Sequence, residues 1–337
     1  MSTEHDCIVS RIGEITKHDN ADTLGITEID GRPCVVRLGE WQTGDLAVYV
    51  PVDSLVPVAE PRFAFLADKA KAGVYRVRAM RLRGVFSMGL LVRPDADMAE
   101  GDVVNERLGI GTYEPDASQS HGPGGSFISG DQDRDPGVLP KYDVESARKY
   151  RRLLIEGEEV VLTEKVHGAN ARFVWHDGRL HCGSRTTYKK PGTGSMWWNV
   201  AEAYDLARLA AHPGIALFGE VYGQVQDLKY GAGPGEHRLV LFDAMDYRTR
   251  KWLDYDAFLA LAASLDLPTT PELYHGPWSE DRWPEFKALA EGPTIVGNGV
   301  HTREGWVLRP TTERHDARLG RVQMKFVGEG YLTRKGG

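Results

Sequence analysis

The stretch Thr163-Glu164-Lys165-Val166-His167-Gly168-Ala169-Asn170 decides how this sequence is read. It continues the apolar run of residues 158–162, which has the pattern of a buried strand, so Lys165 stands at the end of that strand. A charged side chain in such a place is costly unless it is paired or used. A lysine becomes a nucleophile when desolvation or neighbouring cations lower its pKa, and a glycine such as Gly168 lets a ligand approach the backbone closely. The stretch therefore favours covalent chemistry at Lys165, with a surface lysine in a turn as the alternative.

Charged residues also interrupt apolar segments further along the chain. They are Glu220 in residues 217–223, Asp243 after Phe242 in residues 238–246, Glu304 at the start of residues 304–310, and Lys325 in residues 321–327. Each is a weak signal by itself. Together with Lys165 and the pair Ser184-Arg185, they predict a polar site built on the ends and faces of several strands.

The chain divides by composition into two structured parts. Residues before about 110 read as short strands, with a hairpin turn at Asp30-Gly31, and predict a small β-barrel. Residues 111–140 are rich in Gly, Pro, Ser and Asp and predict a linker. Beyond them we expect a helix at residues 143–154 with Asp143 as N-cap, strands joined by a hairpin at Asp177-Gly178, and a helix at residues 252–265. The predicted fold class is α+β, with domains at residues 1–110 and 141–337.

Composition limits the class of protein. Lys plus Arg number 41 and Asp plus Glu 48, so the formal charge is 41 minus 48, or −7, whereas a purely electrostatic nucleic-acid binder is usually basic. The cysteines Cys7, Cys34 and Cys182 are far apart and predict reduced thiols that fill space. No apolar run approaches the roughly 18 residues of a membrane span, and the first residues do not resemble a secretion signal. We expect a cytoplasmic protein that does not enter membranes and is a monomer by default.

The ordered segments resemble the motifs of a known superfamily. Lys-x-His-Gly, Ser-Arg, Phe-Gly-Glu, Leu-Phe-Asp, Glu-Gly and a late strand lysine are similar to the motifs of the covalent nucleotidyltransferases, which include DNA ligases, RNA ligases and RNA capping enzymes. The resemblance covers residues 158–335, and His167 after the lysine resembles RNA ligases, whereas DNA ligases and capping enzymes usually carry Asp there. Residues 20–24, 44–51 and 83–90 look like an OB-type barrel, and a barrel placed before the transferase resembles one branch of ATP-dependent RNA ligases.

The resemblance implies a role for each matching residue. Lys165 would attack the α-phosphorus of ATP and carry AMP as a phosphoramidate. The other implied catalytic residues are Lys325, Arg185 and His167; the implied nucleotide contacts are Glu164, Lys165, Gly168, Asn170, Arg185, Glu220, Phe242, Glu304 and Lys325; and the implied partners of Mg²⁺ or Mn²⁺ are Glu304 and, through water, Glu220. Phe242 would stack on adenine, with plain core packing as the alternative. A structural role for His167 is equally open.

One position departs from the pattern. Many relatives have Lys-x-Lys in the last strand, but residue 323 is Gln, so only Lys325 can be carried over. Arg321 or Arg148 could supply the second cation.

The predicted barrel contains four arginines within eight residues, namely Arg76, Arg78, Arg81 and Arg83. Alternation along a strand would place Arg76 and Arg78 on one face as a stripe that follows phosphates. A solvated edge strand guarded by charge is the alternative. Because the average charge is acidic, nucleic-acid binding would require the cations to be gathered here and around Lys165.

The sequence thus predicts an ATP-dependent RNA ligase that seals RNA with 3′-OH and 5′-phosphate ends, including nicked duplexes, in RNA repair. Two alternatives stay open. One is a DNA ligase or a capping-type nucleotidyltransferase. The other is a non-catalytic RNA-binding protein made of an OB module and a decayed transferase.

Overall fold

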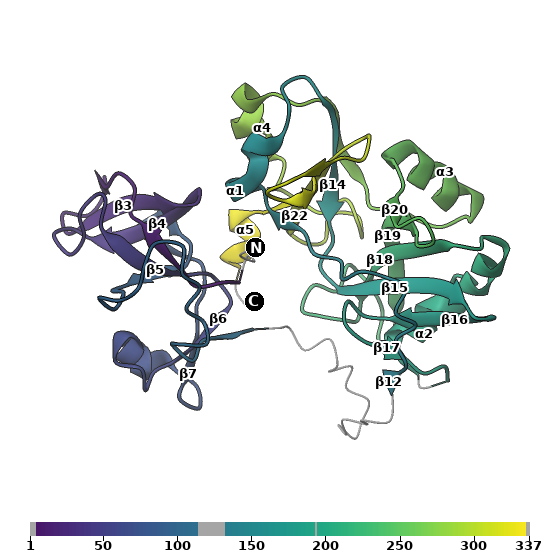
Figure 1. The fold of residues 1–337 in the computed structure, drawn as a ribbon, viewed down its shortest axis with the longest axis horizontal. Coiled ribbons are helices and arrows are strands. Elements are labelled where there is room, and N and C mark those ends of the chain that lie inside the picture. The colour runs from purple at the N-terminus through teal and green to yellow at the C-terminus, as the bar shows by residue number, and fades with distance from the viewer. Residues whose placement is uncertain (1–4, 114–131, 193, 335–337) are drawn as a thin grey trace. The chain divides into compact units, whose positions relative to one another are not determined.

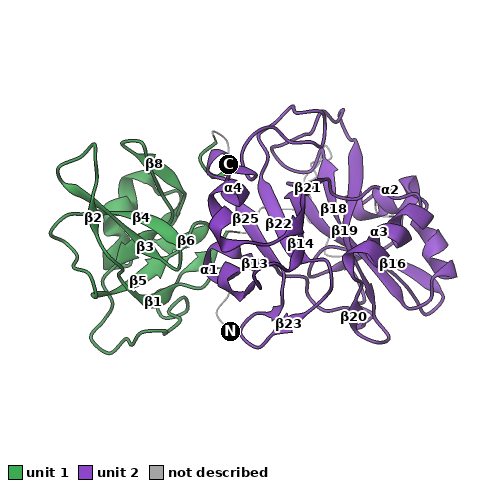
Figure 2. Ribbon diagram, turned by 90° about the horizontal axis from the view of Figure 1, so that it is seen from above, with its two compact units in different colours: residues 1–115, 332–335, 337 green, residues 116–331, 336 purple. Residues whose placement is uncertain are grey.

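Short strands dominate the first part of the chain. The computed structural model describes residues 5–113, 132–192 and 194–334, which form two units drawn in Figures 1 and 2. Unit 1 comprises residues 1–115, 332–335 and 337, and unit 2 comprises residues 116–331 and 336. The linker predicted at residues 111–140 lies largely outside the described residues. Its described flanks form short strands, β11 (Gly111–Thr112) and β12 (Gln132–Asp133).

Unit 1 is built from small antiparallel sheets in the orders β1-β5-β10, β11-β6-β7, β2-β3-β4 and β8-β9. The elements are β1 (Ile8–Arg11), β2 (Thr16–Lys17), β3 (Leu24–Ile29), β4 (Arg32–Arg37), β5 (Leu46–Val50), β6 (Ser54–Pro57), the 3₁₀ segment η1 (Pro61–Lys69), β7 (Val74–Arg76), β8 (Met80–Leu82), β9 (Val85–Ser87) and β10 (Leu90–Val92). The predicted hairpin at Asp30-Gly31 is confirmed, since both residues have positive φ between β3 and β4. Inward-facing Val9, Val48 and Phe63 form the core.

Residues 74–84, which contain the four predicted arginines, form two short strands, β7 and β8. Val77 and Ala79 between them are buried. Arg76 on β7 therefore belongs to a different sheet from Arg81 on β8.

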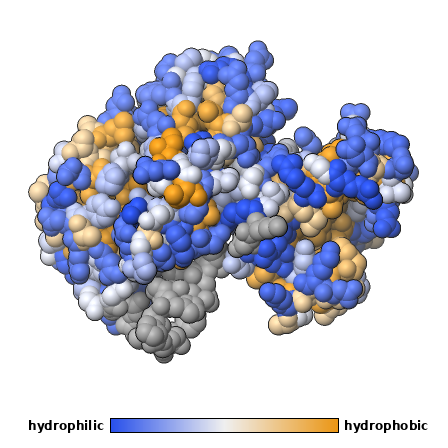
Figure 3. Space-filling view, turned by 180° about the vertical axis from the view of Figure 1, so that it is seen from behind, coloured by the Kyte–Doolittle hydropathy of each residue, from blue (hydrophilic) through white to orange (hydrophobic). Residues whose placement is uncertain are grey.

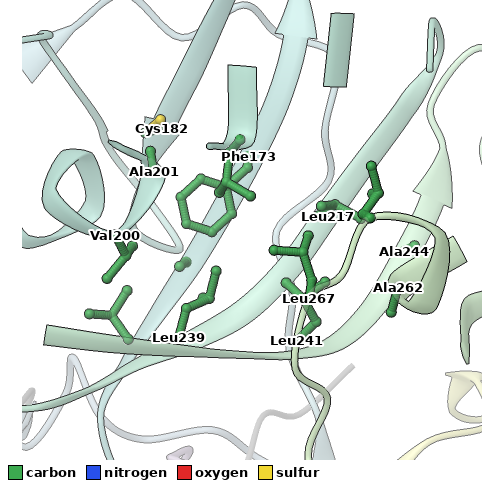
Figure 4. Packing of buried hydrophobic residues seen from close by; sticks show 14 of the residues in the cluster. Phe173, Cys182, Val200, Ala201, Leu217, Leu239, Leu241, Ala244, Ala262 and Leu267 are labelled. Carbon is green, nitrogen blue, oxygen red and sulfur yellow. The ribbon is translucent and has the colours of Figure 1, made fainter. Parts of the chain in front are cut away.

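A seven-stranded sheet, in the order β12-β17-β16-β15-β18-β19-β20, forms half of unit 2. Its longer elements are β15 (Ala169–His176), β16 (Arg179–Gly183), β17 (Tyr188–Lys189), β18 (Ile215–Gly223), β19 (His237–Asp246) and β20 (Lys251–Trp252). One face packs on α2 (Met196–Ala203), η3 (Leu206–Ala211) and α3 (Tyr255–Ser264), and Figure 4 shows Phe173 and Leu217 of that face in the core. Because side chains alternate, Asn170 and Arg172 of β15 lie on the opposite face.

A five-stranded sheet, in the order β13-β25-β22-β14-β21, forms the other half. The elements in and around it are β13 (Glu145–Ser146), α1 (Ala147–Tyr150), η2 (Arg151–Leu153), β14 (Glu159–Lys165), β21 (Glu272–Pro277), η4 (Glu280–Arg282), α4 (Trp283–Ala288), β22 (Gly305–Pro310), β23 (His315–Asp316), β24 (Gly320–Arg321), β25 (Met324–Val327) and α5 (Glu329–Leu332). Leu162, Trp306 and Phe326 face a core that includes Phe286 of α4. Only residues 166–168 separate β14 from β15, so this short connection joins the two sheets.

The helix predicted at residues 143–154 is shorter than expected. The chain first adds β13 to the sheet, in parallel with β25, and α1 starts only after Ser146. Asp143 is therefore not an N-cap, and its carboxylate pairs with Arg185 instead. The predicted helix after Asp254 is confirmed as α3, although the Asp254 carboxylate accepts from the Glu313 N–H rather than from its own helix.

The cysteines Cys7, Cys34 and Cys182 are all buried free thiols. No helix in the described residues is long and apolar enough to cross a membrane. On the face drawn in Figure 3, apolar residues form separate patches among hydrophilic ones, which is the ordinary mixture of a protein surface.

Candidate functional site

Strand register brings the predicted lysines to one face of the five-stranded sheet. Thr163 pairs with Val307, and Val307 pairs with Lys325, so these residues point to the same side. Lys165 follows Thr163 by two residues and shares that face. All of them are partly exposed, whereas Glu164 and the alternate residues of the three strands are buried. The polar face of this sheet therefore carries both Lys165 and Lys325.

Lys165 is ion-paired with Glu304. Its Nζ lies 2.6 Å from Glu304 Oε1, and the other oxygen of this buried carboxylate has no hydrogen-bond partner. Gly305, directly opposite Lys165, makes the contact possible. Its φ is +155°, and a Cβ there would lie 2.0 Å from the Phe326 carbonyl oxygen. In the Glu-Gly sequence, the backbone thus requires the glycine, and the ion pair requires the glutamate.

His167 is held from both sides of its ring. Nε2 lies 2.7 Å from Asp227 Oδ1, and Nδ1 lies 2.8 Å from the Tyr331 hydroxyl on α5. The backbone N–H of His167 donates to the Tyr230 hydroxyl at 2.7 Å. Because a carboxylate only accepts, Nε2 carries the proton and Nδ1 accepts from Tyr331 in the neutral ring. His167 is braced beside Glu304, whose Oε2 lies 3.8 Å from Nδ1.

The other carboxylate of the site belongs to β18. Glu220 pairs across the sheet with Asn170, whose side-chain oxygen is buried without a hydrogen-bond partner. Burial raises the pKa of Glu220 to about 8, with Glu304 adding to the rise and Lys165 opposing it. Gly168 lies against this strand, since a Cβ would come 2.1 Å from the Val221 carbonyl oxygen. The predicted residues Lys165, Gly168, Asn170, Glu220 and Glu304 thus gather where the two sheets join.

Phe242 lies at a register shift in β19. Phe218 pairs with Asp243 but Gly219 pairs with Leu241, so Phe242 is the extra residue of a β-bulge. Its ring is partly exposed and packs on Tyr142, with 4.8 Å between ring centroids. A bulge re-aims a side chain, which leaves Phe242 able to offer a ring face.

Glu164 points away from this face. Its carboxylate accepts from the Thr294 hydroxyl and, at 2.8 Å, from the Ile295 N–H, and Arg303 Nε lies 3.6 Å away. The buried side chain therefore anchors the loop before Arg303. Only the backbone of Glu164 remains for the nucleotide contact predicted at this position.

Gln323 belongs to a buried network that ties the two sheets together. Its amide donates to the Tyr142 hydroxyl at 2.7 Å, and that hydroxyl donates to Asp243 at 2.7 Å. Asp243 also accepts from Arg309 at 2.9 Å and from Arg321 at 2.5 Å. These two arginines hold the pKa of Asp243 below its ordinary value against the opposing effect of burial, which is the largest influence. Arg321 is thus committed to the network, and we do not assign it as a substitute for the absent lysine.

The two remaining candidate arginines of unit 2 lie on different elements. Arg185, in the turn after β16, pairs with Asp143 at 2.8 Å on the surface. Arg148 of α1 stacks on Phe326, with its guanidinium carbon 3.9 Å from the ring centroid.

Comparison with known proteins agrees with this arrangement. The RNA ligase family matches residues 158–327, which is half of the chain. The chain belongs to the RNA ligase family. An OB-fold domain matches residues 7–94, so the α+β fold class, with an OB barrel before the ligase domain, is confirmed. No curated protein matches this chain by sequence.

Solved structures of an RNA ligase share the fold. A lysine-to-alanine mutant of the Naegleria gruberi RNA ligase, solved with ATP and Mn, is 24% identical, with a TM-score of 0.82 over 97% of this chain and 98% of that chain. The same enzyme solved with PPi gives the same identity, TM-score and coverage.

The RNA ligase domain contains no ready-made metal cage among the described residues, which hold no group of three or more His, Cys, Asp or Glu side chains suited to one ion. Two carboxylates interact with Lys165, namely the buried Glu304, which is ion-paired with it, and Glu220, whose pKa it lowers. Such an incomplete set suits Mg²⁺ or Mn²⁺, which keep several waters and take oxygens from substrate phosphates.

The four arginines predicted to bind nucleic acid in the OB unit differ in exposure. Arg76 is half-buried, lies 2.8 Å from Asp53, and stacks on Tyr113. Arg78, Arg81 and Arg83 are exposed. Binding of phosphates by Arg76 and Arg78 stays a prediction, in which Arg76 would first have to leave Asp53.

Sequence reasoning missed the residues that brace the RNA ligase site. Asp227 and Tyr331 hold His167, and Tyr142 supports Phe242. Asp227 and Tyr142 come from irregular segments and Tyr331 from a four-residue helix, so no periodic pattern marks them. Asp243 was visible as a charged residue in an apolar strand, but its partners were not.

Proposed function

We propose that this chain is an ATP-dependent RNA ligase that joins a 3′-OH to a 5′-phosphate through a lysyl-AMP intermediate on Lys165, in RNA repair. The observation that most supports this proposal is the position of Lys165. Its Nζ lies 2.6 Å from Glu304 at the junction of the two sheets, and its side chain is on the same face as Lys325. The family match and the fold support it.

The reaction has three transfers. Lys165 Nζ, after losing a proton, attacks the α-phosphorus of ATP, forming an N–P bond as pyrophosphate leaves. An oxygen of the RNA 5′-phosphate then attacks the AMP phosphorus, and the N–P bond to Lys165 breaks. Finally the 3′-OH attacks the activated 5′-phosphorus, and AMP leaves. Such phosphoryl chemistry depends mainly on alignment and on cations near the phosphate oxygens.

The side chains around Lys165 would divide this work. Lys325 would neutralise phosphate oxygens, and Phe242 would stack on adenine. Glu220 and Asn170 would bind the ribose, and Arg185 would bind phosphates once it leaves Asp143. His167, held by Asp227 and Tyr331, would pack beside Glu304.

A divalent metal fits the chemistry of the site. Glu304 Oε2 is a buried carboxylate oxygen without a hydrogen-bond partner, and Glu220 could contribute through water. When bound, such an ion would neutralise charge that develops on the phosphate oxygens. The Naegleria gruberi enzyme was solved with ATP and Mn, which supports the pairing of these two ligands.

Formation of the adduct tests the proposal. We expect the full chain, incubated with α-labelled ATP and Mg²⁺ or Mn²⁺, to acquire a covalent label that is lost in acid and kept in alkali, as expected of a phosphoramidate. Lys165→Arg should abolish the label, whereas Lys17→Arg, a surface change in the OB unit, should leave it unchanged. A wild-type chain without any label would instead support the non-catalytic RNA-binding protein.

Substrate comparison separates the related enzymes. We expect ATP to label the chain and GTP not to, and nicked RNA to be sealed faster than nicked DNA, because a 2′-OH near the joint distinguishes the two. Labelling by GTP would indicate a capping-type enzyme, and preference for DNA would indicate a DNA ligase.

A further inference from the structure

Arg172 is a buried cation that forms no ion pair with the described residues. It lies in the middle of β15 with 2% of its surface exposed. Its Nε donates to the Ser184 carbonyl at 2.7 Å, and its Nη2 has no hydrogen-bond partner. Within the described part of the chain, no carboxylate lies within ion-pair distance of it. A guanidinium stays charged inside proteins, so this arrangement leaves a positive charge unbalanced.

Another buried arginine of the same domain shows the usual arrangement. Arg309, with 3% of its surface exposed, lies 2.9 Å from Asp243 and 2.7 Å from Glu313. A buried charge is normally compensated in this way, because a charged group that leaves water without a partner destabilises the folded state. Arg172 has no such ion pair with any of the residues that the structure describes.

The sheet directs Arg172 toward the turn that carries Arg185. Arg172 pairs with Gly183, and Gly183 pairs with Tyr188. The guanidinium stacks on Tyr188, 4.5 Å from the ring centroid. The next residues, Ser184 and Arg185, form the turn that Arg172 also holds through its Nε.

Two neighbours of Arg172 are also unsatisfied. The Tyr188 hydroxyl and both ring nitrogens of His181 are buried without hydrogen-bond partners. The His181 and Tyr188 rings meet edge to face, with 6.1 Å between centroids. His181 pairs with Val174, two residues from Arg172, so all three side chains lie on one face of the sheet. Buried polar groups are nearly always bonded, so a cluster of unsatisfied ones indicates a missing ligand.

We propose that Arg172 is the buried half of an anion site for a phosphoryl group, and that Arg185 is its exposed half. Arg172 supplies a fixed charge from the sheet, and the Tyr188 hydroxyl adds a donor. Arg185 changes its partner from the Asp143 carboxylate to the phosphate when the ligand binds. The proposal rests on the proposed function for the source of the phosphate, which is either the RNA 5′ end or the polyphosphate of ATP.

The charge balance predicts an unusual result for a buried substitution. Replacing a buried arginine that has no ion pair by an apolar side chain of similar length should not destabilise the fold, because an uncompensated charge is removed. Arg172→Met in the full chain should therefore keep or raise the thermal midpoint. Arg309→Met is the matched control and should lower it, because Asp243 and Glu313 lose a partner.

Binding provides the second measurement. Wild-type protein and Arg172→Met are titrated with pyrophosphate, and with an oligoribonucleotide that carries either a 5′-phosphate or a 5′-hydroxyl, while the thermal midpoint is followed. We expect Arg172→Met to bind the recognised phosphate roughly tenfold more weakly, and Arg172→Lys to recover part of the loss. A loss confined to the 5′-phosphorylated RNA identifies the RNA end, and a loss confined to pyrophosphate identifies the nucleotide.

Three outcomes would overturn the site. The first is that Arg172→Met binds phosphate as tightly as the wild type, which would fit a buried water in place of the ligand. The second is that the thermal midpoint of Arg172→Met falls as far as that of Arg309→Met. The third is that phosphate does not change the thermal midpoint of the wild type. Labelling of Lys165 by ATP is measured in parallel. A separate outcome is that the wild type takes no label from ATP and still binds phosphate more tightly than Arg172→Met does. In that case the proposed function fails and the anion site stands.

Discussion

At the scale of single residues, Glu220 is the group whose ionisation the fold disturbs most clearly near neutral pH. Burial raises its pKa to about 8 from an ordinary 4.5. An unfolded chain therefore releases this proton at lower pH than the folded chain does. The folded state loses stability as pH rises from about 4.5 to about 8, and the loss is complete above that range.

Glu220→Gln should remove this penalty. We expect its free energy of unfolding to exceed that of the wild type above pH 8, by on the order of 2 kcal/mol once solvent screening of the partly exposed side chain is considered. Below pH 4.5 the two proteins should be alike. Urea unfolding at both extremes measures the difference, and equal stabilities at high pH would contradict an elevated pKa.

At the scale of elements, the position of Glu304 depends on the first residue of β22. Gly305 combines a φ of +155° with contact against the Phe326 carbonyl of β25. Gly305→Ala should cost on the order of 3 kcal/mol or more and abolish labelling of Lys165, because the strand must shift away from β14. Gly320→Ala is the matched control, since its φ is +81° but a Cβ there meets nothing within 4 Å. It should cost about 1 kcal/mol and leave labelling intact.

Local pattern decides which elements a sequence reveals. β14, β18 and β19 were predictable because each contains a run of apolar residues typical of a buried strand. The predicted start of the helix at Asp143 was wrong, because residues 145–146 pair with the edge of β25 before the helix begins. Contacts between distant segments leave no local pattern. The Asp227 brace of His167, the pairing of Arg321 with Asp243 and the isolation of Arg172 therefore appeared only in the folded chain.

At the scale of the whole molecule, we propose that the OB unit binds nucleic acid and the ligase unit carries the covalent chemistry. The triple change Arg78→Ala, Arg81→Ala and Arg83→Ala should leave labelling of Lys165 intact, because that step needs only nucleotide. Sealing of nicked RNA should fall roughly tenfold or more at moderate salt, and the dependence of binding on salt should become less steep.

Arg11→Ala provides the control for this charge effect. Arg11 is an exposed arginine of the same unit, paired with Glu100. Equal loss of sealing in both proteins would show that general charge, rather than the β8–β9 hairpin, accounts for the effect.

The ion pair between Lys165 and Glu304 also bears on how the enzyme survives in a cell. An ammonium group held in an ion pair has no lone pair to offer, so under the proposed function metabolites that acylate or carbamylate exposed lysines would react poorly with Lys165. Reactivity would then depend on a bound metal ion that takes over the Glu304 carboxylate. The contact would protect the resting protein from irreversible chemical damage at the proposed nucleophile.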